Sequence, residues 1–586
     1  MTVYGESMAT LAERAAARYG DRPAARYLRD GEWQTTTYDE LWAQVRDRAL
    51  GLVGLGVEPG DRVAVISQTR YEFSVIDLAI NAAGAVAVPV YPTSSADETE
   101  WVVGNSGAVV AICEDADQVA KLESVRAGLP DLREILVIDP VDGRRSVAEI
   151  AAAAGDASVL DARAAAVRPG DTCLIIYTSG TTGRPKGVAL TNEGFAAGRR
   201  ACAALQIIRT GDVVYLYLPL AHVFAQLVMS ATYGGGGTLA FWGGDATQIV
   251  PELAQVRPQF LPSVPRVFEK VYAGAMALVP PERAEEVATA IEVGVRVREA
   301  REAGGPVEPS DEEIFAKADT ELFPLVRGIF GGELTGAISG AAPIAPEILR
   351  FFYAAGVPVM EGWGMTETSG IGTVNTPAAH RFGAIGRPVE AAELRVADDG
   401  ELEIRGPLLL KEYWRNPQAT AEAFTDDGWF RTGDVGSIDE DGYLFITGRK
   451  KDIIITAGGK NLVPANLEGD LRRSRWIAQA VMYADRKPYP VALITLDAES
   501  VVPWAQARGL PADIAELARH PDVTALIQAE VDAANAGYAR VEQIKRFKIL
   551  GRDFTLDAGE MTPSLKLKRN VVYANYADDF ESLYAD

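Results

Sequence analysis

YTSGTTGRPKG, residues 177–187, is the stretch that decides the fold, and its first residue ends the apolar run 174–177. An apolar run of this kind is typical of a buried strand. The glycines in the loop after it let successive backbone N–H groups point at one place. Further donors come from four hydroxyls and one ammonium: Thr178, Ser179, Thr181, Thr182 and Lys186. We therefore predict a strand that opens into an anion-binding loop.

The spacing of this loop differs from that of a Walker A motif. Gly180 and Gly183 are too close together, and no GK[ST] ends the stretch. A flexible surface turn is the alternative interpretation, and the strand before the loop argues against it.

Length and composition narrow the class of protein. The 586 residues favour two domains, one of them large. With 57 Lys and Arg against 81 Asp and Glu, the net charge is −24. That charge repels phosphate backbones, so we expect no nucleic-acid partner. A hydrophobic content of 48% with 24% charged residues is typical of a globular chain with a sizeable core, and it excludes disorder and collagen-like repeats.

Cysteine and histidine are too few and too scattered for a metal or disulfide framework. The chain has three of each, at no ligand spacing: Cys113, Cys173, Cys202, His222, His380 and His520. We expect a reducing cytoplasm and no structural zinc. The N-terminus lacks a basic segment followed by an uninterrupted apolar stretch, so we expect no secretory signal. The uncharged segment 213–233 is interrupted by Pro219 and by the polar residues His222, Gln226, Ser230 and Thr232, which predicts strand, turn and helix rather than a membrane span.

The order of predicted elements indicates an α/β fold. Helical stretches at 8–20 and 38–56 alternate with short β-rich runs as far as residue 161, the rhythm of a parallel sheet. The segment 393–406 predicts a hairpin at its Asp-Asp-Gly turn and so a β-rich subdomain. We predict a large domain of α/β subdomains plus this β-rich subdomain at 1–450, and a small, mobile α+β domain at 451–586.

Several further motifs follow the loop in order along the chain. They are LPLAHVF (218–224), SGAAP (339–343), EGWGMTET (361–368), DGWFRTGDVG (427–436), GRKKDIIITAGGKNLVP (448–464) and PSLKLKR (563–569). Together with the loop they resemble the signature of the adenylate-forming superfamily, and the resemblance covers essentially the whole chain. Within it, SVPRVFEKVY with the helical insertion after it, and GGKNLVPANLE, resemble bacterial long-chain fatty acyl-CoA synthetases.

The resemblance implies a two-step reaction. A fatty acid would attack the α-phosphate of ATP with Mg²⁺ present, pyrophosphate would leave, and coenzyme A would then take the acyl group from acyl-AMP. Such a displacement depends on positioning and on neutralised charge. Three alternatives remain: a fatty acyl-AMP ligase that delivers its product to an acyl-carrier protein, a luciferase-like oxygenase, and a non-catalytic sensor.

The resemblance also implies a role for individual residues. Lys566 would contact the substrate carboxylate and the α-phosphate, with Lys568 as a rival; Glu367 would hold the metal, with Thr178 as a second ligand. His222, which follows Pro-Leu-Ala and is expected at a strand end, would lie at the floor of the acyl site. Lys451 would be the hinge, and Gly458 and Gly459 would contact coenzyme A. The implied ATP-binding residues are Thr178, Ser179, Gly180, Thr181, Thr182, Gly183, Lys186, Gly340, Ala341, Ala342, Glu361, Gly362, Trp363, Gly364, Thr366, Asp434 and Arg449.

This sequence departs from the family pattern at three positions. Trp363 stands where the family usually has Tyr, which keeps an aromatic face for adenine. Leu565 precedes Lys566, where Gly is more common, and Gln226 occupies a position where some relatives place an aromatic gate. The bland alternatives are a helix cap for Glu367, a core residue for Trp363 or His222, a surface ion pair for Asp434 with Arg449, and solvated basic runs around Lys451 and Lys566.

The basic residues of these motifs form three islands in an acidic chain: Arg184 and Lys186; Arg449, Lys450 and Lys451; Lys566, Lys568 and Arg569. We predict that they draw small anions into one interdomain cleft. We also expect a cytoplasmic protein with at most weak peripheral contact with the inner face of the membrane, because the substrate partitions into lipid while no basic amphipathic helix is evident. Acyl chain length and oligomeric state stay open.

Overall fold

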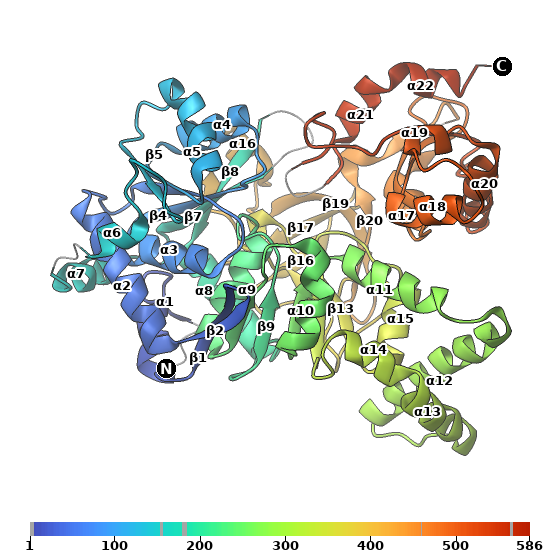
Figure 1. The fold of residues 1–586 in the computed structure, drawn as a ribbon, viewed down its shortest axis with the longest axis horizontal. Helices are drawn as coiled ribbons and strands as arrows, with labels where there is room; N and C mark the ends of the chain where they lie inside the picture. Colours follow the sequence, from blue (N-terminus) through green and yellow to red (C-terminus); the bar gives the residue numbers. More distant parts are fainter. Residues whose placement is uncertain (1–4, 153–155, 179–183, 459, 563–565, 586) are drawn as a thin grey trace.

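The computed structural model describes residues 5–152, 156–178, 184–458, 460–562 and 566–585. A large N-terminal part is built around two mixed sheets, and a small C-terminal part lies against one side of it (Figure 1). The expected α/β fold class, with a β-rich unit between these parts, is confirmed. Predictions for residues 179–183, 459 and 563–565 lie outside the described residues.

The first sheet carries the predicted anion loop. Its strands, in spatial order, are β18 (Glu412–Tyr413), β8 (Lys186–Thr191), β7 (Thr172–Thr178), β4 (Val86–Val90), β3 (Arg62–Ile66), β5 (Ala108–Cys113) and β6 (Glu134–Val137). Strands β4, β3, β5 and β6 pair in parallel, as the alternating helix and strand runs predict. β7 and β8 pair antiparallel, with Thr178 opposite Lys186, so the hairpin presents both residues at one sheet edge.

The second sheet forms the floor of the molecule's main cleft. Its strands, in order, are β15 (Arg387–Pro388), β14 (Thr373–Val374), β13 (Val359–Trp363), β12 (Gly336–Ser339), β11 (Phe260–Ser263), β9 (Val213–Leu216), β10 (Thr238–Phe241), β1 (Pro23–Arg29) and β2 (Glu32–Thr37). The run from β13 to β1 is parallel, so the carboxyl ends of these strands meet at one edge. Ser339 and Trp363 each end a strand at that edge.

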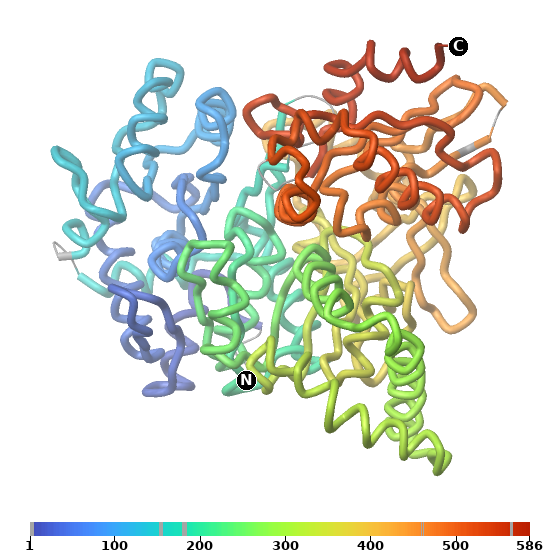
Figure 2. Tube along the Cα trace, turned by 45° about the vertical axis from the view of Figure 1, so that its right-hand side comes forward, coloured from blue at the N-terminus to red at the C-terminus, as the bar shows by residue number. Residues whose placement is uncertain are grey.

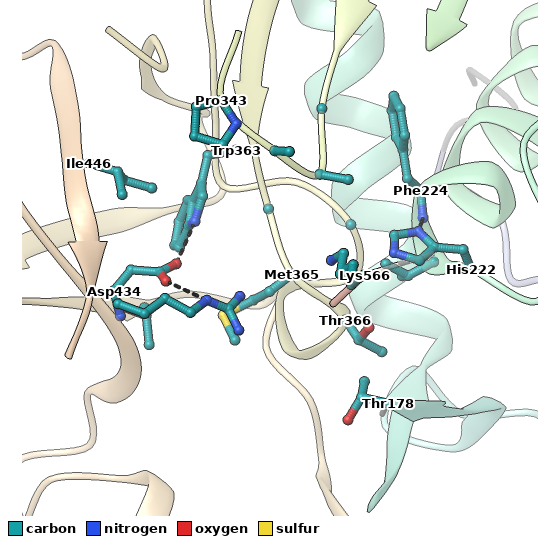
Figure 3. A pocket seen from close by; sticks show the side chains of 18 of the residues that line it. Thr178, His222, Phe224, Pro343, Trp363, Met365, Thr366, Asp434, Ile446 and Lys566 are labelled. Carbon is teal, nitrogen blue, oxygen red and sulfur yellow. Dashed lines mark hydrogen bonds and ion pairs between the residues drawn. The ribbon is translucent and has the colours of Figure 1, made fainter. Parts of the chain in front are cut away.

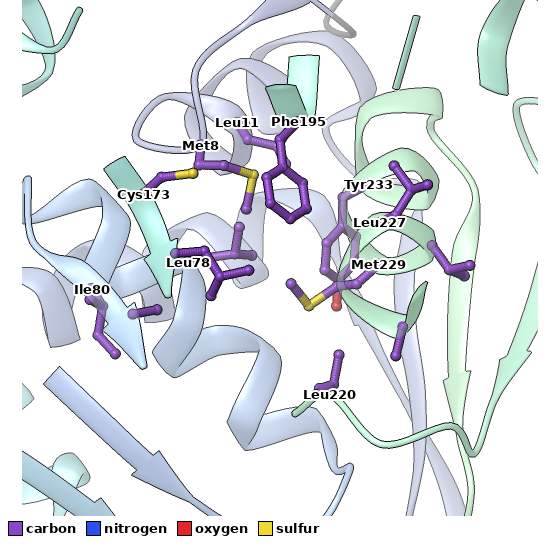
Figure 4. Close-up of a cluster of buried hydrophobic side chains, with 14 of the residues drawn as sticks. Met8, Leu11, Leu78, Ile80, Cys173, Phe195, Leu220, Leu227, Met229 and Tyr233 are labelled. Carbon is purple, nitrogen blue, oxygen red and sulfur yellow. The ribbon is translucent and has the colours of Figure 1, made fainter. Parts of the chain in front are cut away.

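Helices pack between and around the two sheets. They are α1 (Leu11–Tyr19), α2 (Tyr38–Gly54), α3 (Tyr71–Ala82), α4 (Ala96–Ser106), α5 (Ala116–Ser124), α6 (Val147–Ala152), α7 (Ser158–Ala166), α8 (Asn192–Ala204), α9 (Val223–Gly235), α10 (Ile249–Val256), α11 (Pro265–Ala277), α15 (Pro346–Ala355) and α16 (Pro417–Ala423). Figure 4 shows the core in which Phe195, Leu227 and Tyr233 of α8 and α9 meet Leu78 of α3. The uncharged segment 213–233 is thus strand, turn and buried helix, as predicted.

A glycine fixes the end of α9. Gly236 has a φ of 76°, in the left-handed region that stops a helix. A Cβ there would lie 2.5 Å from the ring of Tyr19, so a side chain is excluded on both counts. The helix therefore ends at a defined place, with its other end beside the cleft.

The β-rich subdomain contains the predicted hairpin. β16 (Glu393–Val396), β17 (Glu401–Arg405), β19 (Phe430–Ile438) and β20 (Leu444–Arg449) form one antiparallel sheet. In its register Asp434 lies opposite Arg449, which brings two predicted site residues together from separate motifs.

The helical insertion predicted between Phe268 and Glu321 is present, and its helices continue to Ile329. α12 (Ala284–Glu302), α13 (Pro309–Glu321) and α14 (Phe323–Ile329) project from the body at the lower right of Figure 1. Their buried face shares a core with α15 and with the neighbouring edge of the second sheet.

The C-terminal part has its own hydrophobic core. Two clusters of buried side chains lie wholly at or beyond Ile454. The elements are β21 (Ile454–Ile455), β22 (Asn461–Leu462), β23 (Ile477–Tyr483), β24 (Val491–Leu496), β25 (Arg546–Ile549), α17 (Pro464–Arg472), α18 (Ala498–Gln506), α19 (Ile514–Leu517), α20 (Pro521–Asn535), α21 (Arg569–Asn575) and α22 (Ala577–Ser582). Figure 2 shows this part, in orange and red, at the upper right of the view. Across the described ranges, none of the helices combines the length and the apolar character that a membrane crossing needs.

Candidate active site

One cleft of about 1270 Å³ lies between the N-terminal sheets, the β-rich subdomain and the C-terminal part. Predicted residues from separate motifs line it (Figure 3). They are Thr178, Lys186, His222, Gly340, Ala341, Ala342, Glu361, Gly362, Trp363, Gly364, Thr366, Glu367, Asp434, Arg449, Lys451 and Lys566. The motifs are thus brought to a single site, although their loop residues 179–183 lie outside the described residues.

Trp363, Asp434 and Arg449 form a linked set on one wall. The indole Nε1–H of Trp363 donates to Oδ2 of Asp434 at 2.9 Å, and Arg449 Nε lies 3.2 Å from Oδ1 (Figure 3). The alternative interpretation was an ion pair on the surface. Asp434 is only 4% exposed, so the pair is instead half-buried in the cleft. Burial raises the pKa of Asp434, and the charge of Arg449 opposes that rise.

Glu361 presents an unsatisfied carboxylate oxygen. The side chain is 6% exposed, and its Oε2 has no hydrogen-bond partner among the described residues. Burial raises the pKa of Glu361 to about 7, although hydrogen bonds from the backbone N–H groups of Ile344 and Gly383 lower it in part. An unpaired buried oxygen costs free energy until a donor meets it, so this one is a candidate to accept from a ligand.

Glu367 lies on the opposite side, at the edge of the first sheet. Its Oε1 accepts from the hydroxyl of Tyr413 at 2.8 Å, and Lys186 lies over the same tyrosine ring at 4.9 Å. Burial raises the pKa of Glu367, whereas the Tyr413 hydroxyl and the charges of Arg449 and Lys186 lower it. Tyr413 was not predicted, because no motif surrounds it in the sequence and only β18 pairing with β8 places it here.

The donor set around Glu367 fits a magnesium ion that is shared with phosphates. Thr178 and Glu367 both line the cleft and offer hard oxygen ligands. Among the described residues, no group of three or more His, Cys, Asp or Glu could hold a metal alone. Magnesium commonly takes one or two carboxylates and completes its shell with water and substrate phosphates.

Lys566 is the lysine of PSLKLKR that reaches the cleft. Figure 3 shows it between His222 and the Asp434 wall. Lys566 is exposed as a whole residue, yet its ammonium lies among the cleft walls; desolvation there and the nearby charge of Arg449 lower the pKa of Lys566. Its rival Lys568 instead pairs with Glu98 at 3.5 Å.

His222 caps a helix beside Lys566. Sequence predicted it at a strand end; it is the N-cap residue of α9, where its Nδ1 accepts from the backbone N–H of Phe224 at 3.2 Å. Its proton is therefore assigned to Nε2. Burial and the charge of Lys566 lower the pKa of His222 to about 3, so the ring is neutral at pH 7.

An apolar arm of the cleft runs along α8 and α9. Its lining residues are Cys202, Ile207, Ile208, Leu227, Val228 and Ala231. Gln226, at the predicted gate position, is buried outside this lining and donates to the carbonyl of Leu220 at 2.8 Å. Phe224 lines the cleft instead. The apolar stripe of α9 was the available signal for these residues, but the stripe alone does not distinguish a core from a tunnel.

The predicted hinge residue lines the cleft, whereas Gly458, the described residue that is predicted to contact coenzyme A, is not found there. Lys451 lies in a short 3₁₀ turn (Lys450–Asp452) that lines the cleft and follows β20. Gly458 is exposed and does not line the cleft, and Gly459 lies outside the described residues. In this structure, therefore, the C-terminal part turns Lys566 inward and Gly458 outward.

The three basic islands converge less completely than predicted. Six of their residues line the cleft: Arg184, Lys186, Arg449, Lys450, Lys451 and Lys566. Lys568 and Arg569 do not, because Lys568 pairs with Glu98 and Arg569 pairs with the carboxylate of Glu468 at 2.5 Å. Even so, the cleft lining holds as many Lys and Arg as Asp and Glu, so it is far less acidic than the chain as a whole, whose net charge is −24.

Comparison with known proteins follows the same division of the chain. Residues 12–414 match the family model described as AMP-binding enzyme, and residues 451–586 match AMP-binding enzyme C-terminal domain. The long-chain-fatty-acid–CoA ligase FadD15 of Mycobacterium tuberculosis is 42% identical over 566 residues, which cover 95% of this chain and 93% of that protein.

Solved structures agree on the fold. The adenylation domain of a carboxylate reductase from Mycobacterium chelonae gives a TM-score of 0.76 at 23% identity, covering 99% of this chain and 92% of that one. A Mycobacterium tuberculosis fatty acyl CoA synthetase gives 0.64 at 25% identity, covering 98% and 99%. Given the motif residues gathered in one cleft and the family match over most of its length, this chain belongs to the AMP-binding enzyme family, within the adenylate-forming superfamily that its motifs resemble.

Proposed function

We propose that this protein is a long-chain fatty acid–CoA ligase, which uses ATP to make acyl-AMP and then transfers the acyl group to coenzyme A, releasing AMP and pyrophosphate. The observation that carries this proposal is a single cleft with a charged half and an apolar arm, with Lys566 and His222 where the two meet. The charged half suits a nucleotide, and the apolar arm suits an alkyl chain.

The nucleotide would lie against the Trp363 wall. The Trp363 ring offers a face for adenine, and Oε2 of Glu361 would accept from the exocyclic amine. Asp434 and Arg449 would bind the ribose hydroxyls as acceptor and donor. The 339–343 backbone, in which Ala341 has a φ of 69°, would line the other side of the base.

Acyl-AMP formation needs negative charge to be neutralised as carboxylate and phosphate approach. Lys566 supports this role because its ammonium interacts electrostatically with Arg449, Asp434 and Glu367. Its charge also acts on His222. A positive charge there stabilises a transition state in which negative charge crowds together. Glu367 and Thr178 would hold Mg²⁺, which would neutralise phosphate oxygens.

The neutral ring of His222 would form part of the acyl-site floor. With Nδ1 occupied by the N–H of Phe224, Nε2–H is the donor that remains for a carboxylate oxygen. Beyond it, the apolar arm would hold the alkyl chain, since Leu227, Val228 and Ala231 offer no charge to it. A long chain gains binding free energy with each methylene that it buries.

Transfer to coenzyme A would require the C-terminal part to turn. Lys566 lines the cleft while Gly458 is exposed outside it, so this arrangement serves only the step that uses Lys566. We propose a division into residues 1–450 and 451–586, with rotation at Lys451 that replaces Lys566 by Gly458 and Gly459. Such reorientation about a few residues is a common mode of domain movement.

The experiment is to incubate the protein with ATP, Mg²⁺, coenzyme A and carboxylic acids of increasing length, and to identify thioesters by mass. We expect acyl-CoA and AMP, with long acids preferred. A parallel reaction with an acyl-carrier protein tests the fatty acyl-AMP ligase alternative: product on the carrier without free acyl-CoA would refute coenzyme A as the acceptor.

The role of Lys566 is tested by separating the two steps. We expect Lys566→Ala to abolish pyrophosphate release while thioester formation from presynthesised acyl-AMP largely persists. Lys568→Ala is the matched control, because that lysine of the same motif does not line the cleft and pairs with Glu98 instead. Equal loss of both steps in Lys566→Ala would contradict the assignment.

A cytoplasmic location with weak peripheral contact at the inner face of the membrane stays a prediction. Flotation of the protein with fatty-acid-loaded liposomes would test the contact, and recovery of the protein wholly in the unbound fraction would contradict it.

A further inference from the structure

Helix α11 and the C-terminal part are held together by two ion pairs. Arg266 Nη2 lies 2.9 Å from Oδ2 of Asp497, and Lys270 Nζ lies 2.8 Å from Oε2 of Glu499. Both cations belong to α11, and both carboxylates lie at the start of α18, where Asp497 is the N-cap residue and Glu499 lies in the first turn. Within the described ranges, neither cation has a second ion-pair partner.

These cations lie beside the cleft. Glu269, between them in the sequence, lines the cleft, and α11 follows directly on β11, whose Phe260 lines it too. The charges of Arg266, Arg472 and Arg473 act on Glu269 and lower its pKa, against a larger rise caused by burial. Helix α11 itself carries two cations and the single carboxylate of Glu269, so it has an excess of positive charge once Asp497 and Glu499 are left out.

The proposed rotation would uncover this wall. If the C-terminal part turns to bring Gly458 inward, Asp497 and Glu499 leave α11, and two cations one helical turn apart lose their counter-charges. They lie in the first turns of α11, where the helix dipole also favours an anion. Arginine and lysine are the residues that most often bind phosphate, Arg in bidentate fashion and Lys as a point charge.

We propose that Arg266 and Lys270 bind the phosphates at the nucleotide end of coenzyme A once the C-terminal part has turned, and that Asp497 and Glu499 occupy the same cations until then. This inference rests on the proposed function, because coenzyme A is the second substrate only of that reaction. Such a site would give the two steps an order. The nucleotide end of coenzyme A could bind only after the C-terminal part has left the arrangement that forms acyl-AMP.

The test uses the second step alone. Thioester formation from presynthesised acyl-AMP is measured with coenzyme A and with pantetheine, which has the same thiol arm but no nucleotide. We expect the double variant Arg266→Ala with Lys270→Ala to raise KM for coenzyme A at least tenfold and to change the rate with pantetheine less than twofold. Dephospho-coenzyme A, which lacks the 3′-phosphate, should show a smaller rise.

Two controls separate phosphate binding from other effects. Asp497→Ala with Glu499→Ala breaks the same ion pairs but keeps the cations, so KM for coenzyme A should stay equal or fall. Lys317→Ala is a matched surface control: its lysine pairs with Glu286 at 2.7 Å and is 59% exposed, against 2.8 Å and 54% for Lys270. It should change nothing in either assay.

Three results would overturn the proposal. They are an unchanged KM for coenzyme A in the double variant, an equal loss with coenzyme A and pantetheine, or the same rise in the Asp497→Ala with Glu499→Ala variant. The last two would mean that α11 acts only through the contact between the two parts. If the wild-type protein forms no thioester with either thiol, the proposed function fails and this inference fails with it; loss confined to the variants overturns the inference alone.

Discussion

Glu361 gives a prediction whose size follows from the structure. The carboxyl is buried, its Oε2 has no partner among the described residues, and burial raises its pKa from an ordinary 4.5 to about 7. The native state therefore binds this proton more tightly than the unfolded chain does. Between pH 4.5 and 7 the native protein holds more protons, so stability falls as pH rises through that window.

The change to make is Glu361→Gln, which has nearly the same shape and does not titrate. Each tenfold change in an acid constant corresponds to ~1.4 kcal/mol, so a pKa rise from 4.5 to about 7 costs the wild type about 3 kcal/mol at pH 8. The variant is free of that cost. Its stability relative to the wild type should thus increase by about 3 kcal/mol between pH 4.5 and pH 8.

The assay is thermal unfolding of both ligand-free proteins across this pH range, compared as the difference in Tm at each pH. A chain with two cores need not unfold in one step, so the transition of the N-terminal part is followed. Glu390→Gln, at an exposed position, controls for the loss of one negative charge. A Tm difference that is flat with pH, or a variant less stable at pH 8, would refute the reasoning from burial.

Three further predictions rest on separate parts of the structure. Asp77 is fully buried, neither of its carboxylate oxygens has a partner among the described residues, and burial raises its pKa to about 7. Asp77→Asn should therefore raise Tm more at pH 8 than at pH 5 and leave kcat unchanged. Melting curves and a ligase assay can check both. Trp363→Phe keeps an aromatic face but removes the hydrogen-bond donor to Asp434. A hydrogen bond to a charged group contributes about 1.5–3 kcal/mol, so KM for ATP in pyrophosphate exchange should rise roughly tenfold or more. An unchanged KM would mean that this hydrogen bond does not position the nucleotide site. Cys202→Phe adds bulk to the apolar arm and should lower kcat/KM for long acids more than for short ones; equal loss across lengths would mean that this arm does not hold the alkyl chain.

Local pattern was enough to predict most elements. The alternation of helical and β-rich runs predicts β3 to β6, and the Asp-Asp-Gly turn predicts the β16–β17 hairpin. Such features depend on neighbouring residues, whose periodicity is visible in the chain itself. His222 was placed less well: the apolar run before it suggested a strand end, but Pro219 and the turn after β9 make it the cap of α9.

The composition of the cleft could be predicted from motifs, but its geometry could not. The family resemblance favoured Lys566, but the sequence left Lys568, two residues away in the same basic run, as a rival. The structure separates the two lysines because Glu98, far away in the chain, forms an ion pair with Lys568. Tyr413 carries no motif at all, and its bond to Glu367 exists only because β18 pairs with β8.

By itself the sequence determined the α/β class, the family and the residues available for chemistry, because periodicity and motifs are properties of short segments. Tertiary structure alone decided which of those residues share a cleft, which charges are buried and which are paired. Burial and pairing depend on packing between segments hundreds of residues apart, as between Arg266 and Asp497 or His222 and Lys566. The stretch 177–187 shows both sides: its residue types predict an anion-binding loop, while only the pairing of β7 with β8 brings Thr178 opposite Lys186.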